Sequence, residues 1–282
     1  MLNDVTFGQF YPAKSFVHKL DPRMKLLALI AYIVLLFCAD NFYSLLACAI
    51  VLLAAIIASR VPFGRVLKSV KAIIFILIFT SVLNLFFHGG KHILLEWKFI
   101  KIYREGVIFA AFLILRLFFL VMASSILTLT TTPVSLTDGI ESLLTPLKWI
   151  RFPVHELALI MSIALRFIPT LIDETNRIIS AQKARGADFE SGNIFKRIKA
   201  IIPILIPLLI SAFRRAEELG DAMDARCYTG SKTRTKYKKL KLGVRDLVTF
   251  LVFGALIAGV VLLNIYCYQI CPQIYEFVVV VR

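Results

Sequence analysis

The sequence predicts an all-α, polytopic membrane protein with about five transmembrane helices and two further long helices on the cytoplasmic side. Its composition supports this class, because 59% of its 282 residues are hydrophobic and its mean hydropathy is +0.81. Soluble domains contain only about 45–50% apolar residues. The apolar residues are also concentrated in long runs instead of being spread over the faces of a soluble core, which indicates helices that cross a bilayer.

Five apolar runs are candidates for transmembrane helices, which need about 20 residues to cross the bilayer core. They are Met24–Cys38, Phe42–Ser59, Ala72–Phe87, Gly106–Leu129 and Leu247–Tyr268. The short polar break at residues 39–41 predicts a helical hairpin of the first two runs. Charges and a proline precede the first run, so residues 1–20 do not have the pattern of a cleavable signal peptide.

The distribution of Lys and Arg predicts the orientation in the membrane. Segment 148–245 contains 19 Lys and Arg residues against 9 Asp and Glu, and basic connections of this kind stay in the cytoplasm. With the basic leader and the loop Arg60–Lys71 on the same side, the amino terminus is cytoplasmic. We therefore expect an amino-terminal transmembrane region of four helices at 1–130, a cytoplasmic domain at 131–244, and a last transmembrane helix with an outer tail at 245–282.

The sequence contains none of the common patterns of catalytic or metal sites. Its 4 histidines are scattered and its 5 cysteines form no CxxC pair, and HExxH, G-x-S-x-G and glycine-rich phosphate loops are absent. We therefore expect no enzyme activity, no cofactor and no metal. The basic run Lys232–Lys241 has the composition of a nucleic-acid patch, but it directly precedes the last apolar run. Contact with lipid headgroups is the simpler interpretation, and no nucleic-acid partner is expected.

The apolar stretch His155–Ile172 differs from the transmembrane runs. Glu156 and Arg166 interrupt it, and its apolar residues recur three and four positions apart, as on one side of a helix. A helix from Val154 to about Gly186 is about 50 Å long, which exceeds the thickness of the bilayer core. We expect this helix to lie along the membrane surface or below it.

A second stretch, Ile198–Phe213, is apolar but short for a transmembrane helix. It contains Pro203 and Pro207, and a strongly charged segment follows it. A proline within a helix removes a backbone hydrogen bond and bends the helix. The pattern therefore predicts one kinked helix from about Ile194 to Arg226, with a sixth membrane crossing as the alternative.

The two long helices are predicted to end in the same sequence frame. Segments 181–186 and 222–227 align with an offset of 41 residues, and each contains an Ala-Arg pair. An alanine lets a helix end approach another protein closely, and a guanidinium is a planar group of five donors for carboxylates. Capping of a helix end by a cation explains one copy, but the repeat favours docking to two equivalent sites. The candidate docking residues are Ala184, Arg185, Gly186, Ala225, Arg226 and Cys227.

Two polar residues lie within the transmembrane runs. The run that contains Arg116 has no acidic residue, so we expect Arg116 to have a structural role facing the bundle interior or a partner. Asn84 is expected to form a hydrogen bond to another helix. The alternative function, a self-contained secondary transporter, needs ionisable or broken-helix sites near the membrane midplane. These two residues are the candidates that the sequence offers for such a site.

Several motifs are found along nearly the whole chain: SFVHKLDPRMKL at 15–26, LTLTTTP at 127–133, PVHELAL at 153–159, ALRFIPT at 164–170, AQKARGA at 181–187 and AMDARCY at 222–228. They resemble the transmembrane T component of energy-coupling factor (ECF) transporters, a family that includes the T subunits of cobalt and nickel transporters. The two Ala-Arg frames are the most specific part of this resemblance.

The resemblance implies an ATP-driven importer of a vitamin or metal ion in the cell membrane. Its expected partners are two cytoplasmic ABC-type ATPase subunits and one small substrate-binding membrane subunit, the S component, with this chain as the non-catalytic scaffold. The two long helices then correspond to coupling helices, and Arg185 and Arg226 match the arginines that insert into the ATPases. At Cys227 the family often has Gly or Ser, and cysteine is poorly suited to the left-handed turn that ends many helices.

Overall fold

The computed structural model of the chain describes residues 10–39, 41–87, 93–97, 100–150, 152–187, 194–228, 230 and 243–270. The basic run Lys232–Lys241, with its expected lipid contact, lies outside these residues. So does the carboxyl-terminal segment 271–282, which the sequence predicts to be an outer tail.

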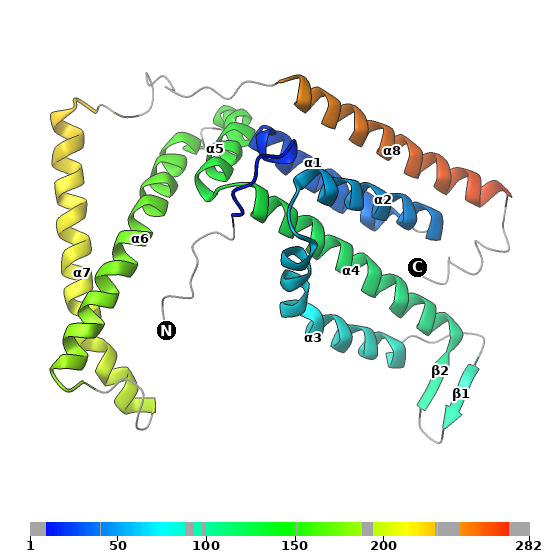
Figure 1. The fold of residues 1–282 in the computed structure, drawn as a ribbon, viewed down its shortest axis with the longest axis horizontal. Helices are drawn as coiled ribbons and strands as arrows, with labels where there is room; N and C mark the ends of the chain where they lie inside the picture. Colours follow the sequence, from blue (N-terminus) through cyan, green and yellow to red (C-terminus); the bar gives the residue numbers. More distant parts are fainter. Residues whose placement is uncertain are drawn as a thin grey trace. The chain divides into compact units, whose positions relative to one another are not determined.

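The described chain is mainly helical, which confirms the predicted fold class (Figure 1). The long helices are α1 (Pro22–Cys38), α2 (Phe42–Ser59), α3 (Phe63–Phe87), α4 (Arg104–Thr130), α5 (Pro133–Leu144), α6 (Val154–Ala184), α7 (Ile194–Ala225) and α8 (Val244–Ile270). Short 3-10 helices are formed by η1 (Val17–Lys19) and η2 (Thr145–Ile150). The sequence analysis did not predict the antiparallel hairpin of β1 (Ile93–Trp97) and β2 (Ile100–Tyr103), which directly precedes α4.

Four helices within the described residues are long and apolar enough to cross a membrane: α2, α4, α6 and α8. The helix α3 adds a fifth if its two halves, which are bent by 56° at a break after Lys71, form one span. The predicted number of about five spans is therefore confirmed. The set of helices differs from the prediction, because α6 qualifies by length and composition, whereas α1 has only 17 residues. Placement of α6 on the cytoplasmic side stays a prediction.

Contacts divide the chain into two compact units, which we name the bundle unit and the arm unit. The bundle unit comprises Gly8–Ile140 and Leu240–Arg282, and the arm unit comprises Glu141–Lys239 with Met1–Phe7. The core of the bundle unit is built from α1, α2, α3, α4 and α8. Its buried side chains include Leu36, Cys48, Val66, Met122 and Val260.

The leader motif at 15–26 joins the start of α1 to the end of α4. The Asp21 side chain caps α1 by accepting a hydrogen bond from the backbone N–H of Arg23 at 3.0 Å. Lys25 Nζ donates to the carbonyl of Thr130 at 2.9 Å and to Thr131 Oγ1 at 3.2 Å. The ammonium thus binds a carbonyl that the end of α4 leaves free. Two motifs that are far apart in the sequence, 15–26 and 127–133, are therefore held together.

Helices α5 and α8 meet α1 near the same point. The Asp246 carboxylate accepts hydrogen bonds from the backbone N–H of Asp21 at 2.9 Å and from that of Gly243 at 2.7 Å. In α5, Gly139 lies so close to Pro22 that a Cβ at position 139 would be 3.1 Å from Pro22 Cβ. The absence of a side chain at Gly139 is what permits this close approach of the two helices.

Candidate docking site on two crossed helices

The arm unit contains two long helices, α6 and α7, that pack against each other and cross in Figure 1. Both are amphipathic, because apolar residues recur every three or four positions along them. Pro169 lies within α6, and Pro203 and Pro207 lie within α7, yet each helix continues through them. The observed bounds, Val154–Ala184 and Ile194–Ala225, agree with the predicted helices to within two residues.

An ion pair connects the two helices. Arg215 Nη2 of α7 donates to Glu174 Oε2 of α6 at 2.6 Å, and Ser211 Oγ donates to the other carboxylate oxygen. A charge-assisted hydrogen bond of this kind is stronger and more directional than one between neutral groups. The contact therefore favours one register of α6 against α7.

The ion pair joins equivalent positions of the two helices. Glu174 and Arg215 are separated by the same offset of 41 residues as Arg185 and Arg226, so each arginine follows its crossing residue by 11 positions. At 1.5 Å per residue, each helix extends about 16 Å from the ion pair to its arginine. The two helices run in roughly opposite directions past the crossing (Figure 1).

Helix α6 ends in a Schellman motif around its arginine. The N–H of Gly186 donates to the carbonyl of Lys183 at 3.0 Å, and that of Ala187 donates to the carbonyl of Gln182 at 3.0 Å. Gly186 has a φ of 86°, a left-handed conformation that glycine adopts without a steric penalty. Arg185 is thereby held at the last position before the chain turns away.

Helix α7 ends in the same motif, shifted by the same offset. The N–H of Cys227 donates to the carbonyl of Asp224 at 2.9 Å, and that of Tyr228 donates to the carbonyl of Met223 at 3.1 Å. Cys227 has a φ of 56°, so it takes the left-handed position of Gly186. The turn forms although cysteine is poorly suited to it, because the two backbone hydrogen bonds offset the strain of its Cβ.

All six predicted docking residues are exposed: Ala184, Arg185, Gly186, Ala225, Arg226 and Cys227. Within the part of the chain that the structure describes, neither arginine side chain has a hydrogen bond or an ion pair. The guanidinium groups are therefore available to bind carboxylates or carbonyls of another protein. Their docking role stays a prediction.

A large apolar face on α7 is also exposed. Its side chains include Ile202, Leu205, Ile206, Leu209, Ile210 and Phe213. They follow the spacing of one side of a helix. In the arm unit described by itself, no other element covers this face, which therefore has the properties of a contact surface for lipid or for another membrane protein.

The two polar residues predicted within the transmembrane runs lie in the bundle unit. Arg116 Nη2 donates to the carbonyl of Ala39 at 2.9 Å, at the turn between α1 and α2. Asn84 Nδ2 donates to the carbonyl of Thr80 at 2.9 Å, within its own helix α3. This hydrogen bond is intrahelical, and the expected bond of Asn84 to another helix stays a prediction.

The sequence analysis missed the residues of the crossing, Glu174, Ser211 and Arg215. The 41-residue offset was a usable signal, because it relates Glu174 to Arg215 as it relates Arg185 to Arg226. Among the residues that the structure describes, no group of three His, Cys, Asp or Glu side chains is arranged to hold a metal ion.

An apolar helical bundle together with two long amphipathic helices defines a multi-pass α-helical membrane protein. Residues 13–237 match the CbiQ family, which is described as cobalt transport protein. The chain belongs to this family of transmembrane components of ECF transporters.

Relatives in several bacteria support this assignment. The chain is 52% identical over 252 residues to the energy-coupling factor transporter transmembrane protein EcfT of Clostridium kluyveri, covering 89% of this chain and 93% of the relative. It is 51% identical over 258 residues to EcfT of Acidaminococcus fermentans, covering 91% and 95%. It is 44% identical over 260 residues to EcfT of Bacillus subtilis, covering 91% and 98%. The matches extend over nearly the full length of these relatives.

Proposed function

We propose that this chain is the scaffold that transmits ATP hydrolysis by two ABC-type ATPase subunits to a substrate-binding membrane subunit, for uptake of a vitamin or metal ion. The observation that carries this proposal is the repeated helix end. Two helices end in the same capped turn, and each presents an exposed arginine without a partner among the described residues. Two equivalent ends suit two copies of one kind of subunit.

The chemistry of each end suits insertion into a groove of a soluble ATPase. Ala184 and Ala225 keep the helix ends narrow beside Arg185 and Arg226, which allows close approach. A guanidinium that becomes desolvated against carboxylates or carbonyls forms a strong and directional anchor. The ATPases stay in the cytoplasm, so the proposal places both arginines and the amino terminus on the cytoplasmic side.

The exposed apolar face of α7 is the proposed contact surface for the substrate-binding subunit. A helix that is charged at its anchored end and apolar along its length can move with the ATPase while it slides against a membrane protein. The ion pair of Glu174 and Arg215 keeps α6 and α7 crossed at one point during this movement. Nucleotide-driven closure of the ATPases would then change the angle between the helices and reorient the substrate-binding subunit.

The test is truncation of the two arginines in the assembled complex. Arg185→Ala and Arg226→Ala should each weaken copurification of the ATPases, and the double variant should weaken it more, because loss of a desolvated charged contact costs about 2–5 kcal/mol. Arg177→Ala and Arg214→Ala are matched controls, since both arginines are exposed and lie on the same helices away from the ends. These controls should copurify and transport normally.

Two results would reject the proposal. One is a double variant that still binds both ATPases and transports normally. The other is labelling of cysteines introduced at positions 185 and 226 from opposite sides of the membrane. Substrate uptake by this chain alone in vesicles, driven by an ion gradient, would favour the secondary transporter instead.

A further inference from the structure

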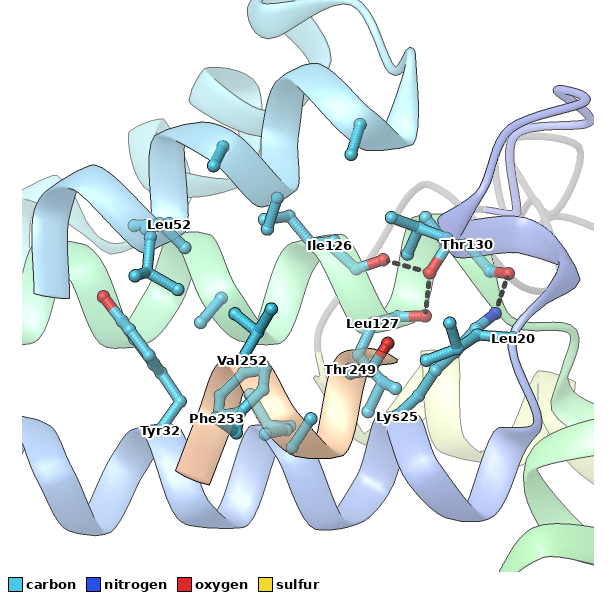
Figure 2. Close-up of a pocket in the computed structure, with 18 of the residues that line it drawn as sticks. Leu20, Lys25, Tyr32, Leu52, Ile126, Leu127, Thr130, Thr249, Val252 and Phe253 are labelled. Carbon is cyan, nitrogen blue, oxygen red and sulfur yellow. Dashed lines mark hydrogen bonds between the residues drawn. The ribbon is translucent and has the colours of Figure 1, made fainter. Parts of the chain in front are cut away.

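A cavity of about 290 Å3 lies within the bundle unit, between η1, α1, α2, α4 and α8 (Figure 2). Its volume is close to the lower limit of about 300 Å3 for small-molecule sites. Most of the lining is aliphatic, as at Ala55 and Leu127. Three lining residues, Phe16, Val248 and Val252, are 42%, 44% and 49% exposed. The cavity therefore opens to the surface of the bundle unit.

The two ends of the cavity differ in polarity. Lys25, Thr130 and Thr249 lie together at one end, whereas Tyr32 and Leu52 lie at the other (Figure 2). A long apolar space with one cationic end has the shape and polarity of a site for an amphiphile with a negatively charged head.

Lys25 is a buried cation that forms no ion pair within the described part of the chain. Its side chain lines the cavity and the residue is only 7% exposed. Its printed partners, the Thr130 carbonyl and the Thr131 hydroxyl, are neutral oxygens. An ammonium has three donors, so one donor is left for a further acceptor. A buried charge is costly unless an opposite charge accompanies it, and an anion at this end of the cavity would supply that charge.

We propose that the cavity binds one acyl chain of an anionic phospholipid, with the phosphate of its headgroup beside Lys25. The protein lies in a bilayer, where phospholipid is the most concentrated apolar molecule. Two exposed basic residues accompany the cationic end: Lys19 directly precedes the lining residue Leu20, and Arg245 lies one helical turn before Thr249. Basic pockets between transmembrane helices on the cytoplasmic side are suited to anionic headgroups. An apolar helix of a partner protein would leave the Lys25 charge unmatched.

Native mass spectrometry of the full chain tests this site. The chain is purified in mild detergent and incubated with equal amounts of phosphatidylglycerol and phosphatidylcholine that carry the same acyl chains. We expect the wild type to retain one phosphatidylglycerol with about fivefold preference, the factor expected for one nearby cation. Ala55→Phe and Ala58→Phe fill the cavity from α2 and should lose the bound lipid, whereas Lys25→Met should lose the preference for the anionic headgroup.

Two matched variants control for the size and charge of the changes. Ala111→Phe adds the same ring at an exposed position of α4 outside the cavity, and Lys14→Met removes an exposed charge of the leader. Both should retain lipid as the wild type does. Normal helical content by circular dichroism identifies the folded variants.

Several outcomes would overturn the lipid site. They are retention of lipid by both folded filling variants, a preference for phosphatidylglycerol that survives Lys25→Met, retention of free fatty acid only, or no retention by the wild type. Occupation of the cavity by a partner subunit instead of lipid would also overturn the proposed lipid site. None of these outcomes depends on Arg185 or Arg226, so the lipid site and the coupling role can fail separately.

Discussion

Glu174 of α6 and Arg215 of α7 occupy equivalent positions of two helices related by a 41-residue offset, and their side chains meet at 2.6 Å. The side chains of Arg215 and Glu174 are 29% and 25% exposed, so solvent screens the pair only in part. Both helices continue for 11 residues beyond this pair to Arg185 and Arg226. This pair is therefore one of the contacts that set the geometry of the two candidate docking ends.

Charge exchange tests this contact. Glu174→Gln and Arg215→Met should each lower the free energy of unfolding by about 0.5–1.5 kcal/mol, because each removes a partly screened, charge-assisted hydrogen bond. The exchanged variant, Glu174→Arg with Arg215→Glu, should recover most of the loss, as measured by thermal unfolding in detergent. If the exchanged variant loses as much free energy of unfolding as the two single variants together, Glu174 and Arg215 do not stabilise the protein by pairing with each other.

The two helix ends allow opposite predictions at equivalent positions. Cys227→Gly removes a Cβ from a left-handed residue and should stabilise the protein by about 0.5–1 kcal/mol. Gly186→Ala introduces a Cβ at φ 86° and should destabilise it by about 1 kcal/mol. Thermal unfolding measures both changes, and amide hydrogen exchange of the last turns shows whether they are local. If both substitutions stabilise the protein, or both destabilise it, the two caps are not equivalent.

The helices could be predicted from the sequence where an apolar run and a helix have nearly the same bounds. The run Phe42–Ser59 coincides with α2, and the other predicted runs differ mainly at their ends. The largest error is α3, which starts at Phe63 and not at Ala72. Arg65, Lys68 and Lys71 look like loop residues in the sequence, yet they lie in the first turns of the helix. Hydropathy shows which residues avoid water, whereas a helix continues into water when its backbone hydrogen bonds are satisfied.

The candidate site was predictable in part for a similar reason. The repeated Ala-Arg frames are local in the sequence, and the comparison of two segments was enough to find them. The pairing of Glu174 with Arg215 depends on how α6 and α7 cross, which no local pattern specifies. The same limit applies to the contact of Lys25 with Thr130, which joins residues 105 positions apart.

Gly139 provides a test of close helix packing in the bundle unit. Gly139→Ala should destabilise the protein by about 1–2 kcal/mol, because the added Cβ would be 3.1 Å from Pro22 Cβ and 3.3 Å from the Pro22 carbonyl carbon. Gly220→Ala is the matched control, since no atom lies within 4 Å of a Cβ built at this helical glycine. It should stabilise α7 by about 0.5–1 kcal/mol through helix propensity alone. Equal thermal shifts for the two variants would contradict the close contact.

The turn between α1 and α2 is held by side chains of two other helices, Arg116 of α4 and Asn264 of α8. Arg116 donates to the carbonyl of Ala39 at 2.9 Å, and Asn264 Nδ2 donates to that of Cys38 at 2.8 Å. Asn264 Oδ1 also accepts from Ser44 Oγ at 2.7 Å. Since neighbouring carbonyls are bound by two different helices, each contact limits how far the turn can move when the other is lost.

Arg116→Met and Asn264→Leu should therefore each lower the free energy of unfolding by about 0.6–1.7 kcal/mol, the range for hydrogen bonds between membrane helices. The double variant should lose more than the sum of the two, because either remaining contact partly holds the turn in the single variants. Asn84→Ala is the control and should change stability by less than about 0.5 kcal/mol, since the hydrogen bond of Asn84 stays within α3. Strictly additive losses in a double-mutant cycle of thermal unfolding would show that the two contacts act independently and do not share the α1–α2 turn.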